Sequence, residues 1–369
     1  MRFTRRDIVA GLGALPLGAC SIGVRPRAAL VSAAKTAGDQ YVAVRISDRD
    51  EIDYVVPLPE RGHDALVSPD GQVLTVVARR PGRTIAQFRW SDGKLLGVME
   101  AAKNRHFYGH AIYGPGGRTL LTSENDLETG DGVITVRDGT TLEPITTFPS
   151  FGIGPHEMVW HPDNGNLVVA NGGIATHPDY GRVPLNVGAM TPSLVQIDVR
   201  RGILIDKRTP RFNESSVRHI DILNDGTTLV GLQQQEGLAE DAALVVSANW
   251  STGEARELEA LTANSADLRA LESYTASVCC EPRSGISVVT APRGHRVTFW
   301  NARKGTHLKT VRISDAAGVT FDANSHEFVI SSGRGILRRY AADTLIENTE
   351  RRKRFDDLRF DNHITIASI

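Results

Sequence analysis

Short runs of apolar residues recur along the whole chain, and turn-forming residues separate them. One example is the run Val73-Leu74-Thr75-Val76-Val77, which follows the turn Pro69-Asp70-Gly71. Alternating and β-branched runs of this length predict strands, and Pro, Asp and Gly predict the turns between them. Because long amphipathic helical patterns are scarce, the sequence predicts an all-β protein.

These strands form a repeated unit, which is clearest between Gly152 and Asn186. The unit consists of a strand that begins with a histidine, a turn, a second apolar strand and a long polar loop. Each unit holds about four short strands, as does a propeller blade of roughly 40 to 50 residues. Units of this kind begin near His63, His110, His156, His219, Thr275 and Ala317.

The two ends of the chain complete a further blade. The segment around Asp361-Asn362-His363 repeats an opening strand but has no blade after it, whereas three strands in residues 28–58 lack an opening strand. Pairing the two ends leaves no long exposed edge. We therefore predict a seven-bladed β-propeller over residues 28–369, with two packed β domains as the alternative.

The segment before the propeller has the features of an export signal. Arg5 and Arg6 precede an apolar run that ends at Leu17, the pattern of a twin-arginine signal, and the run is too short to span a bilayer. Leu17-Gly18-Ala19-Cys20 is similar to the lipobox of bacterial lipoproteins. We predict a signal peptide over 1–19, lipidation of Cys20 and a tether over 20–27. The alternative is an ordinary secretory signal with an incidental cysteine.

This signal also predicts the location of the protein. A lipidated Cys20 followed by Ser21 places the chain at the periplasm, anchored by lipid only, in the outer membrane rather than the inner one. The other two cysteines, Cys279 and Cys280, are adjacent and point to opposite sides of a strand. We predict two separate thiols, at least one of them buried, with a vicinal disulfide as the alternative.

Charge excludes one class of partner. The chain has 42 basic and 43 acidic residues, a formal net charge of -1, and no basic stripe interleaved with aromatic residues. Nucleic acid is therefore not an expected partner.

The spacing of histidines is the main functional pattern. Intervals of 47, 46, 63 and 144 residues separate five of them, and 144 is three steps of 48. Five blades thus begin with a histidine on the strand that lines the central channel, so these side chains are predicted to form a ring at one mouth, open near Thr275, Ser277 and Ala317. The five are His63, His110, His156, His219 and His363.

Polar loops that follow the second strand of each blade would lie beside this ring. The long loop 172–186 contains His177 and is expected to be a lid, a binding loop or a plain turn. The supporting residues predicted in these loops are Glu124, Asn125, Asp126, Asn171, His177, Arg79, Arg293 and Arg334. Four histidines outside the spacing are expected in turns or at the surface, namely His161, His295, His307 and His326.

Three interpretations of the ring remain open. The histidines could hold neighbouring blades together. They could bind a transition metal, iron or copper, since imidazole suits both; iron would also need the oxygens of Glu124, Asp126 and Glu157. They could bind an organic or anionic ligand together with Arg79, Arg293 and Arg334.

Whether the protein is an enzyme is left open by the sequence. His156, Glu157 and Arg293 could form the site of a propeller hydrolase of the lactonase type. No Ser-His-Asp arrangement or glycine-framed nucleophile is evident. We therefore favour a binding or scaffold protein.

Several motifs resemble the bacterial family called domain of unknown function 1513. They are Gly152-Ile153-Gly154-Pro155-His156-Glu157, Phe107-Tyr108-Gly109-His110, Ala170-Asn171-Gly172-Gly173, Arg218-His219, Pro292-Arg293-Gly294 and Asp361-Asn362-His363. The resemblance implies an exported propeller encoded beside iron-regulated, imelysin-like lipoproteins, which would be its partners in periplasmic iron acquisition. It implies no particular activity, and the adjacent cysteines depart from the family pattern.

Overall fold

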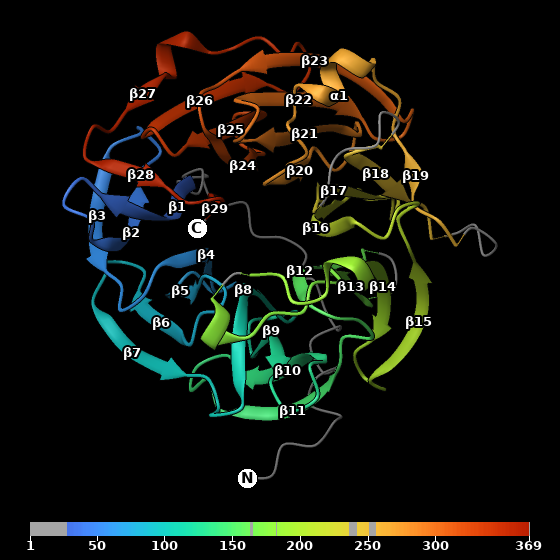
Figure 1. Ribbon diagram of the computed structural model, residues 1–369. Coiled ribbons are helices and arrows are strands. Elements are labelled where there is room, and N and C mark those ends of the chain that lie inside the picture. The colour runs from blue at the N-terminus through green and yellow to red at the C-terminus, as the bar shows by residue number, and fades with distance from the viewer. Residues whose placement is uncertain (1–27, 163–164, 182, 236–241, 251–255, 369) are drawn as a thin grey trace, which may run out of the picture.

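The computed structural model describes residues 28–162, 165–181, 183–235, 242–250 and 256–368. These residues form seven sheets arranged in a ring around a central axis (Figure 1). The protein is therefore a seven-bladed β-propeller, as the sequence predicts. The export signal and Cys20 lie outside the described residues.

The first blade contains both ends of the described chain. Strands β1 (Ala28–Thr36), β2 (Tyr41–Ile46) and β3 (Ile52–Pro57) form its outer part. The strands β28 (Leu358–Phe360) and β29 (Thr365–Ser368) both pair antiparallel with β1, with Ala34 opposite Phe360 and Leu30 opposite Ile366. Figure 1 shows these blue and red strands together at one side of the ring. The predicted closure of the ring is confirmed.

Each of the other six blades is an antiparallel sheet of four consecutive strands, with the first strand nearest the axis. Blade 2 contains β4 (Gly62–Val67), β5 (Val73–Ala78), β6 (Thr84–Arg89) and β7 (Leu95–Glu100). Blade 3 contains β8 (Arg105–Tyr113), β9 (Thr119–Asp126), β10 (Gly132–Asp138) and β11 (Pro144–Pro149). Blade 4 contains β12 (Pro155–Trp160), β13 (Leu167–Asn171), β14 (Ser193–Asp198) and β15 (Ile203–Arg208).

The remaining blades follow the same order. Blade 5 contains β16 (Ser215–Ile222), β17 (Thr228–Gln234), β18 (Val245–Ala248) and β19 (Glu259–Ala260). Blade 6 contains β20 (Val278–Cys280), β21 (Ile286–Ala291), β22 (Arg296–Asn301) and β23 (Thr306–Arg312). Blade 7 contains β24 (Ala316–Asp322), β25 (Glu327–Ser332), β26 (Ile336–Ala341) and β27 (Lys353–Arg354).

Short helical segments occur only in connections within the described part of the chain. They are η1 (Pro178–Tyr180), η2 (Val187–Ala189), α1 (Ser265–Arg269) and η3 (Thr349–Arg351). Among the described residues, none of these helices has the length and apolar character needed to cross a membrane.

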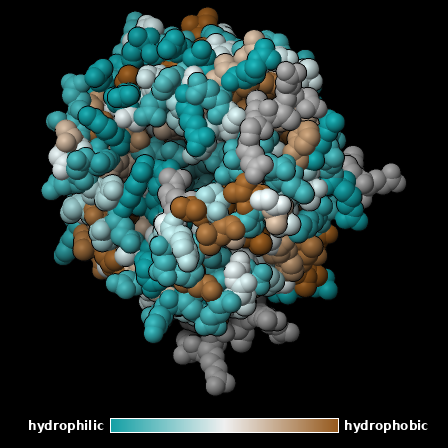
Figure 2. Space-filling model, viewed as in Figure 1, coloured by the Kyte–Doolittle hydropathy of each residue, from teal (hydrophilic) through white to brown (hydrophobic). Residues whose placement is uncertain are grey.

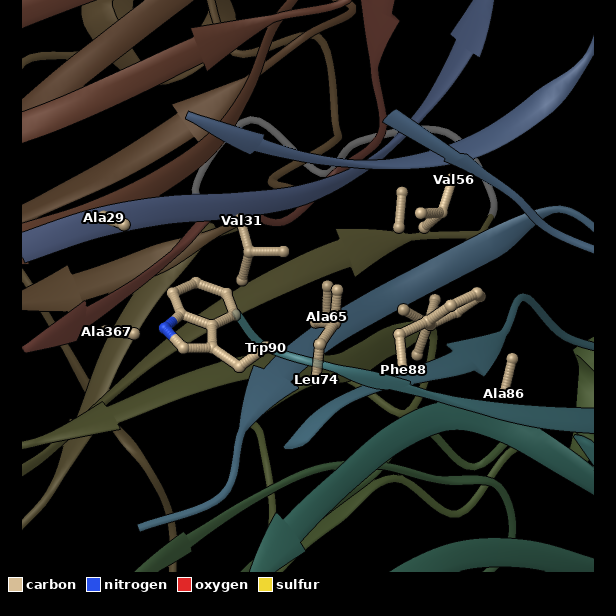
Figure 3. Close-up of a cluster of buried hydrophobic side chains, with 11 residues drawn as sticks. Ala29, Val31, Val56, Ala65, Leu74, Ala86, Phe88, Trp90 and Ala367 are labelled. Atoms are coloured by element: carbon tan, nitrogen blue, oxygen red, sulfur yellow. The ribbon is translucent and has the colours of Figure 1, made fainter. Parts of the chain in front are cut away.

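The hydrophobic core is divided into clusters between neighbouring blades. In the cluster drawn in Figure 3, Val31 of β1 packs with Leu74 of β5, Phe88 of β6 and the nearby Trp90. Because blades cover both faces of a middle strand, β5 is buried from Leu74 to Ala78, which explains its continuous apolar run. Apolar packing thus lies between the blades, and polar side chains are left to line the channel.

The two remaining cysteines are part of this packing. Cys279 and Cys280 lie in β20 as free thiols, and both are buried. Cys280 accepts a hydrogen bond from the Ser287 hydroxyl at 3.2 Å. The prediction of two separate thiols is confirmed.

Candidate metal centre

The five spaced histidines meet in the channel and are called the histidine cluster below. Each comes from the innermost part of its blade, and none is more than 7% exposed. The centres of adjacent rings lie 4.7 to 4.8 Å apart, in the order His63, His110, His156, His219, His363 and back to His63.

The cluster is more compact than the open ring that the sequence predicts. In a flat pentagon the diagonals would be much longer than the sides. The centres of His110 and His363 nevertheless lie only 4.6 Å apart, and those of His63 and His156 lie 5.6 Å apart. The imidazoles are therefore packed against one another inside the channel and do not surround an open mouth.

Carboxylates from neighbouring blades lie against the Nδ1 atoms of this cluster. Nδ1 of His63 is 3.4 Å from Oδ1 of Asp361, and Nδ1 of His219 is 3.2 Å from Oε2 of Glu157. Nδ1 of His110 is 3.7 Å from Oδ2 of Asp64. An acceptor at Nδ1 holds the proton on that nitrogen, so Nε2 of the neutral ring keeps its lone pair.

β-bulges bring these carboxylates into place. The pairing register shifts between Gly62 and Asp64 in β4, so His63 and Asp64 escape the strict alternation of a strand. As a result, both of these consecutive residues contact His110. His63 does so through its ring, and Asp64 does so through its carboxylate.

The same arrangement recurs in β12. Its register shifts between Pro155 and Met158, and both His156 and Glu157 contact His219 of the next blade. Glu157 also accepts a hydrogen bond from the Ile220 backbone N–H at 2.9 Å. The carboxylate therefore fixes the position of both the ring and the backbone that carries it.

Burial keeps most of the cluster neutral. Removal from water lowers the pKa of His63, His156 and His219 well below the ordinary value of 6.5. It also lowers the pKa of His363 to about 3, helped by the neighbouring His110 and His219. Neutral imidazoles offer the lone pairs that a metal ion needs.

His110 and Asp361 respond differently to burial. Burial alone would lower the pKa of His110, but Asp64 and Glu157 raise it above its usual value. Burial alone would raise the pKa of Asp361, but His63 and Arg79 hold it far below the usual range. Asp361 therefore remains a carboxylate that orients His63.

Four buried ring nitrogens of the cluster have no hydrogen-bond partner in the part of the chain that the structure describes. They are Nε2 of His63, His110 and His363, and Nδ1 of His156. Their placement allows metal binding, because three sets of ligand atoms lie within 4.8 Å of one another: His63, His110 and His363; His110, His156 and His219; and Glu157, His219 and His363.

A small cavity of about 30 Å³ lies beside the cluster. Because a water needs roughly 10 to 15 Å³ measured this way, the cavity has room for about two waters. On the face shown in Figure 2 the middle of the molecule is hollowed and bordered mainly by hydrophilic residues. The cavity is lined by His63, His156, His219, Arg79, Arg80, Arg218, Tyr108, Gln233, Tyr274 and Asn362.

Two of the predicted acidic residues have structural partners away from the cluster. Glu124 is buried and forms an ion pair with Arg137 at 2.7 Å. Asp126 pairs with Arg105 at 3.0 Å and accepts backbone hydrogen bonds of the turn that follows it. Both carboxylates are held within blade 3, and neither belongs to the three sets of possible metal ligands found among the described residues.

The other predicted loop residues are likewise used elsewhere. Asn171 donates to the Ser150 carbonyl at 2.9 Å and Asn125 donates to the Thr176 carbonyl at 3.3 Å, so both tie loops together. His177 caps η1 by accepting from the Asp179 backbone, which makes it a turn residue.

The predicted arginines divide into two groups. Arg79 lines the cavity and donates to Asp361 at 2.7 Å. Arg293 lies outside that lining, with its guanidinium 4.3 Å from the centre of the Tyr274 ring, and Arg334 is exposed. Of the proposed lactonase residues, only His156 faces the cavity.

Several residues of the site were missed by reasoning from sequence. The sequence analysis gives no role in the site to Asp64, Asp361, Arg80 or Arg218. One signal could have identified all of these except Arg80. An acidic or basic residue stands within two positions of four cluster histidines: His63-Asp64, His156-Glu157, Arg218-His219 and Asp361-Asn362-His363.

Fold and site together define a seven-bladed propeller with a buried histidine cluster in its channel. The model of the family described as "Protein of unknown function (DUF1513)" matches residues 56–367, and the chain belongs to this family. No curated protein matches the sequence.

Among solved structures, the chain is similar to hydrazine synthase from Kuenenia stuttgartiensis. The similarity has a TM-score of 0.60 and 14% sequence identity, and it covers 93% of this chain and 99% of that one. At this identity the likeness concerns the fold alone.

Proposed function

We propose that the histidine cluster binds a transition metal ion. The observation that carries this proposal is the set of four buried ring nitrogens that have no hydrogen-bond partner among the described residues. An unsatisfied buried polar group costs about 1 to 3 kcal/mol, so a merely structural role would leave several such costs in one place. A metal ion would use these lone pairs, while Asp361, Asp64 and Glu157 orient the rings.

The donor set favours borderline divalent ions. Five imidazoles without a thiolate suit Cu(II), Zn(II) or Fe(II). Glu157 could supply one oxygen beside His219 and His363, a set of two histidines and one carboxylate that suits Fe(II). In the structure, however, Glu157 accepts from His219, which supports an all-imidazole site and a metal such as copper or zinc.

In the cell we place this site in periplasmic metal handling, iron acquisition included. The paired arginines and the lipobox-like sequence at Cys20 support an exported protein held at the outer membrane by lipid only. The family resemblance supports other periplasmic iron-uptake lipoproteins as partners. Export of folded proteins by the twin-arginine route is compatible with a metal loaded before export.

A lactonase is the second candidate, and the structure gives it little support. The cavity has room for about two waters, so a sugar lactone would not fit inside it as a whole. Arg293 stacks on Tyr274 and Glu157 is engaged by His219. We therefore favour a binding protein over a hydrolase.

Elemental analysis of protein purified without a His tag tests the proposal. It is combined with calorimetric titration of Cu(II), Zn(II) and anaerobic Fe(II) into metal-free protein. We expect binding with a defined stoichiometry in the wild type and its loss in the His110→Ala/His156→Ala variant. His177→Ala serves as control, because His177 caps a turn in the loop. Absence of metal binding by the folded wild type would refute the proposal.

A further inference from the structure

The wall of the small cavity is strongly basic. Three guanidinium groups line it, those of Arg79, Arg80 and Arg218, and none of the described residues in this lining is acidic. The charge of Arg79 is offset by Asp361, to which it donates at 2.7 Å. The wall beside the histidine cluster therefore contains basic side chains and no carboxylate among its described residues.

Arg80 is the guanidinium group of this wall that is best placed to bind a ligand. Arg80 is only 8% exposed, and its Nη1 is buried with no hydrogen-bond partner among the described residues. Its guanidinium lies 5.8 Å from the centre of the Tyr108 ring. No carboxylate among the described residues forms an ion pair with it. A buried cation without a counter-charge is costly, and a bound anion would remove that cost.

We propose that this cavity binds a small oxyanion, of the size of nitrite or bicarbonate, between Arg80 and the histidine cluster. The volume of about 30 Å³ fits a group of a few atoms. A guanidinium matches a planar oxyanion with two parallel hydrogen bonds, which explains an arginine rather than a lysine at this place.

The position of the cavity gives this anion a second role that rests on the proposed metal function. His63, His156 and His219 belong both to the cluster and to the wall of the cavity. A divalent ion held by neutral imidazoles would add positive charge beside Arg80, and an anion in the cavity would offset it. The oxyanion is therefore a co-ligand of the metal, and each is expected to strengthen binding of the other by the same factor.

Anion binding is tested first on metal-free protein. Thermal unfolding is followed with sodium nitrite, sodium bicarbonate or sodium sulfate at fixed pH and ionic strength. Nitrite and bicarbonate are expected to raise the midpoint, and sulfate is expected to have less effect because of its size. Arg80→Gln should weaken nitrite binding by roughly ten- to a hundredfold, the usual effect of losing a charge-assisted hydrogen bond. Arg334→Gln is the control, because Arg334 is an exposed arginine.

Coupling between metal binding and oxyanion binding is tested by titrating Zn(II) into the protein with and without nitrite. We expect tighter Zn(II) binding with nitrite in the wild type and in Arg334→Gln, and no such gain in Arg80→Gln. If Arg80→Gln does not fold, Arg80→Lys, which keeps the charge but loses the planar fork, replaces it. A change in the visible spectrum of the Cu(II)-loaded wild type on addition of nitrite gives a reading that needs no variant.

The outcomes separate the two proposals. Stabilisation by nitrite that depends on Arg80, without any metal binding, supports the oxyanion site and refutes the metal function. Metal binding that nitrite leaves unchanged, together with no nitrite effect on metal-free protein, refutes the oxyanion site and leaves the metal function standing. Equal nitrite effects in wild type and Arg80→Gln also overturn the oxyanion site.

Discussion

Glu157 of blade 4 lies 3.2 Å from Nδ1 of His219 in blade 5, and its carboxylate also accepts from the backbone of Ile220. One side chain thus joins two blades and fixes the orientation of a cluster imidazole. The relationship makes Glu157 a positioning residue for the proposed metal site.

Glu157→Gln is predicted to weaken metal binding by about ten- to a hundredfold, the usual effect of losing an outer carboxylate partner of a histidine ligand. Competition titration with a chelator of known affinity measures the affinity of the wild type and of the variant for the metal. The matched control is Glu347→Gln, which removes a carboxylate paired with Arg352 away from the cluster. Unchanged affinity in Glu157→Gln would show that the carboxylate serves only to join the blades.

The stability of metal-free protein is predicted to fall as the pH drops below about 6.5. Burial lowers the pKa of His63, His156 and His219, and lowers that of His363 to about 3. The unfolded chain binds protons at these rings near pH 6.5 while the folded protein does not, so acid favours unfolding. The raised pKa of His110 favours the folded protein in acid, but it concerns one histidine against four.

Thermal unfolding at pH 7.5 and pH 5.5 checks this pH dependence. A His63→Gln/His363→Gln variant should show a smaller difference between the two midpoints than the wild type. His326→Gln, at an exposed position, should retain the wild-type difference. Equal differences in all three proteins would mean that the cluster does not control acid sensitivity.

Glu124→Ala is predicted to destabilise the fold without altering metal stoichiometry. Glu124 and Arg137 form a buried ion pair at 2.7 Å, and removal of one partner from such a pair costs about 3 to 5 kcal/mol. Urea unfolding measures the loss, and elemental analysis measures the metal. A Glu124→Leu/Arg137→Met variant should recover part of the stability. Loss of metal from folded Glu124→Ala would instead assign Glu124 to the site.

Phe360→Ala is predicted to weaken the closure of the ring. Phe360 lies in β28 opposite Ala34 of β1, is 4% exposed, and packs in the cluster that contains Leu358 and Ile364. Truncation of a buried phenylalanine costs about 3 to 5 kcal/mol. Urea unfolding should show this loss, whereas exposed Leu95→Ala on the outer strand of blade 2 should show little. A loss no larger than that of Leu95→Ala would mean that closure does not limit stability.

The sequence alone determined the fold and the meeting of the five histidines. Turn residues and apolar runs repeat with the period of a blade, and a period forces equivalent positions onto equivalent strands. His63 and His110, 47 residues apart, therefore had to lie on neighbouring innermost strands. The unfinished repeat near His363 likewise had to pair with β1.

The tertiary structure alone decided what surrounds the histidines. Periodicity says nothing about β-bulges, which bring Asp64 and Glu157 against rings of other blades in spite of the strict alternation of a strand. It also does not separate Arg80, buried beside the cluster, from the exposed Arg334, since both follow a second strand. Contacts between blades fix these environments, and they depend on side chains that are distant in sequence.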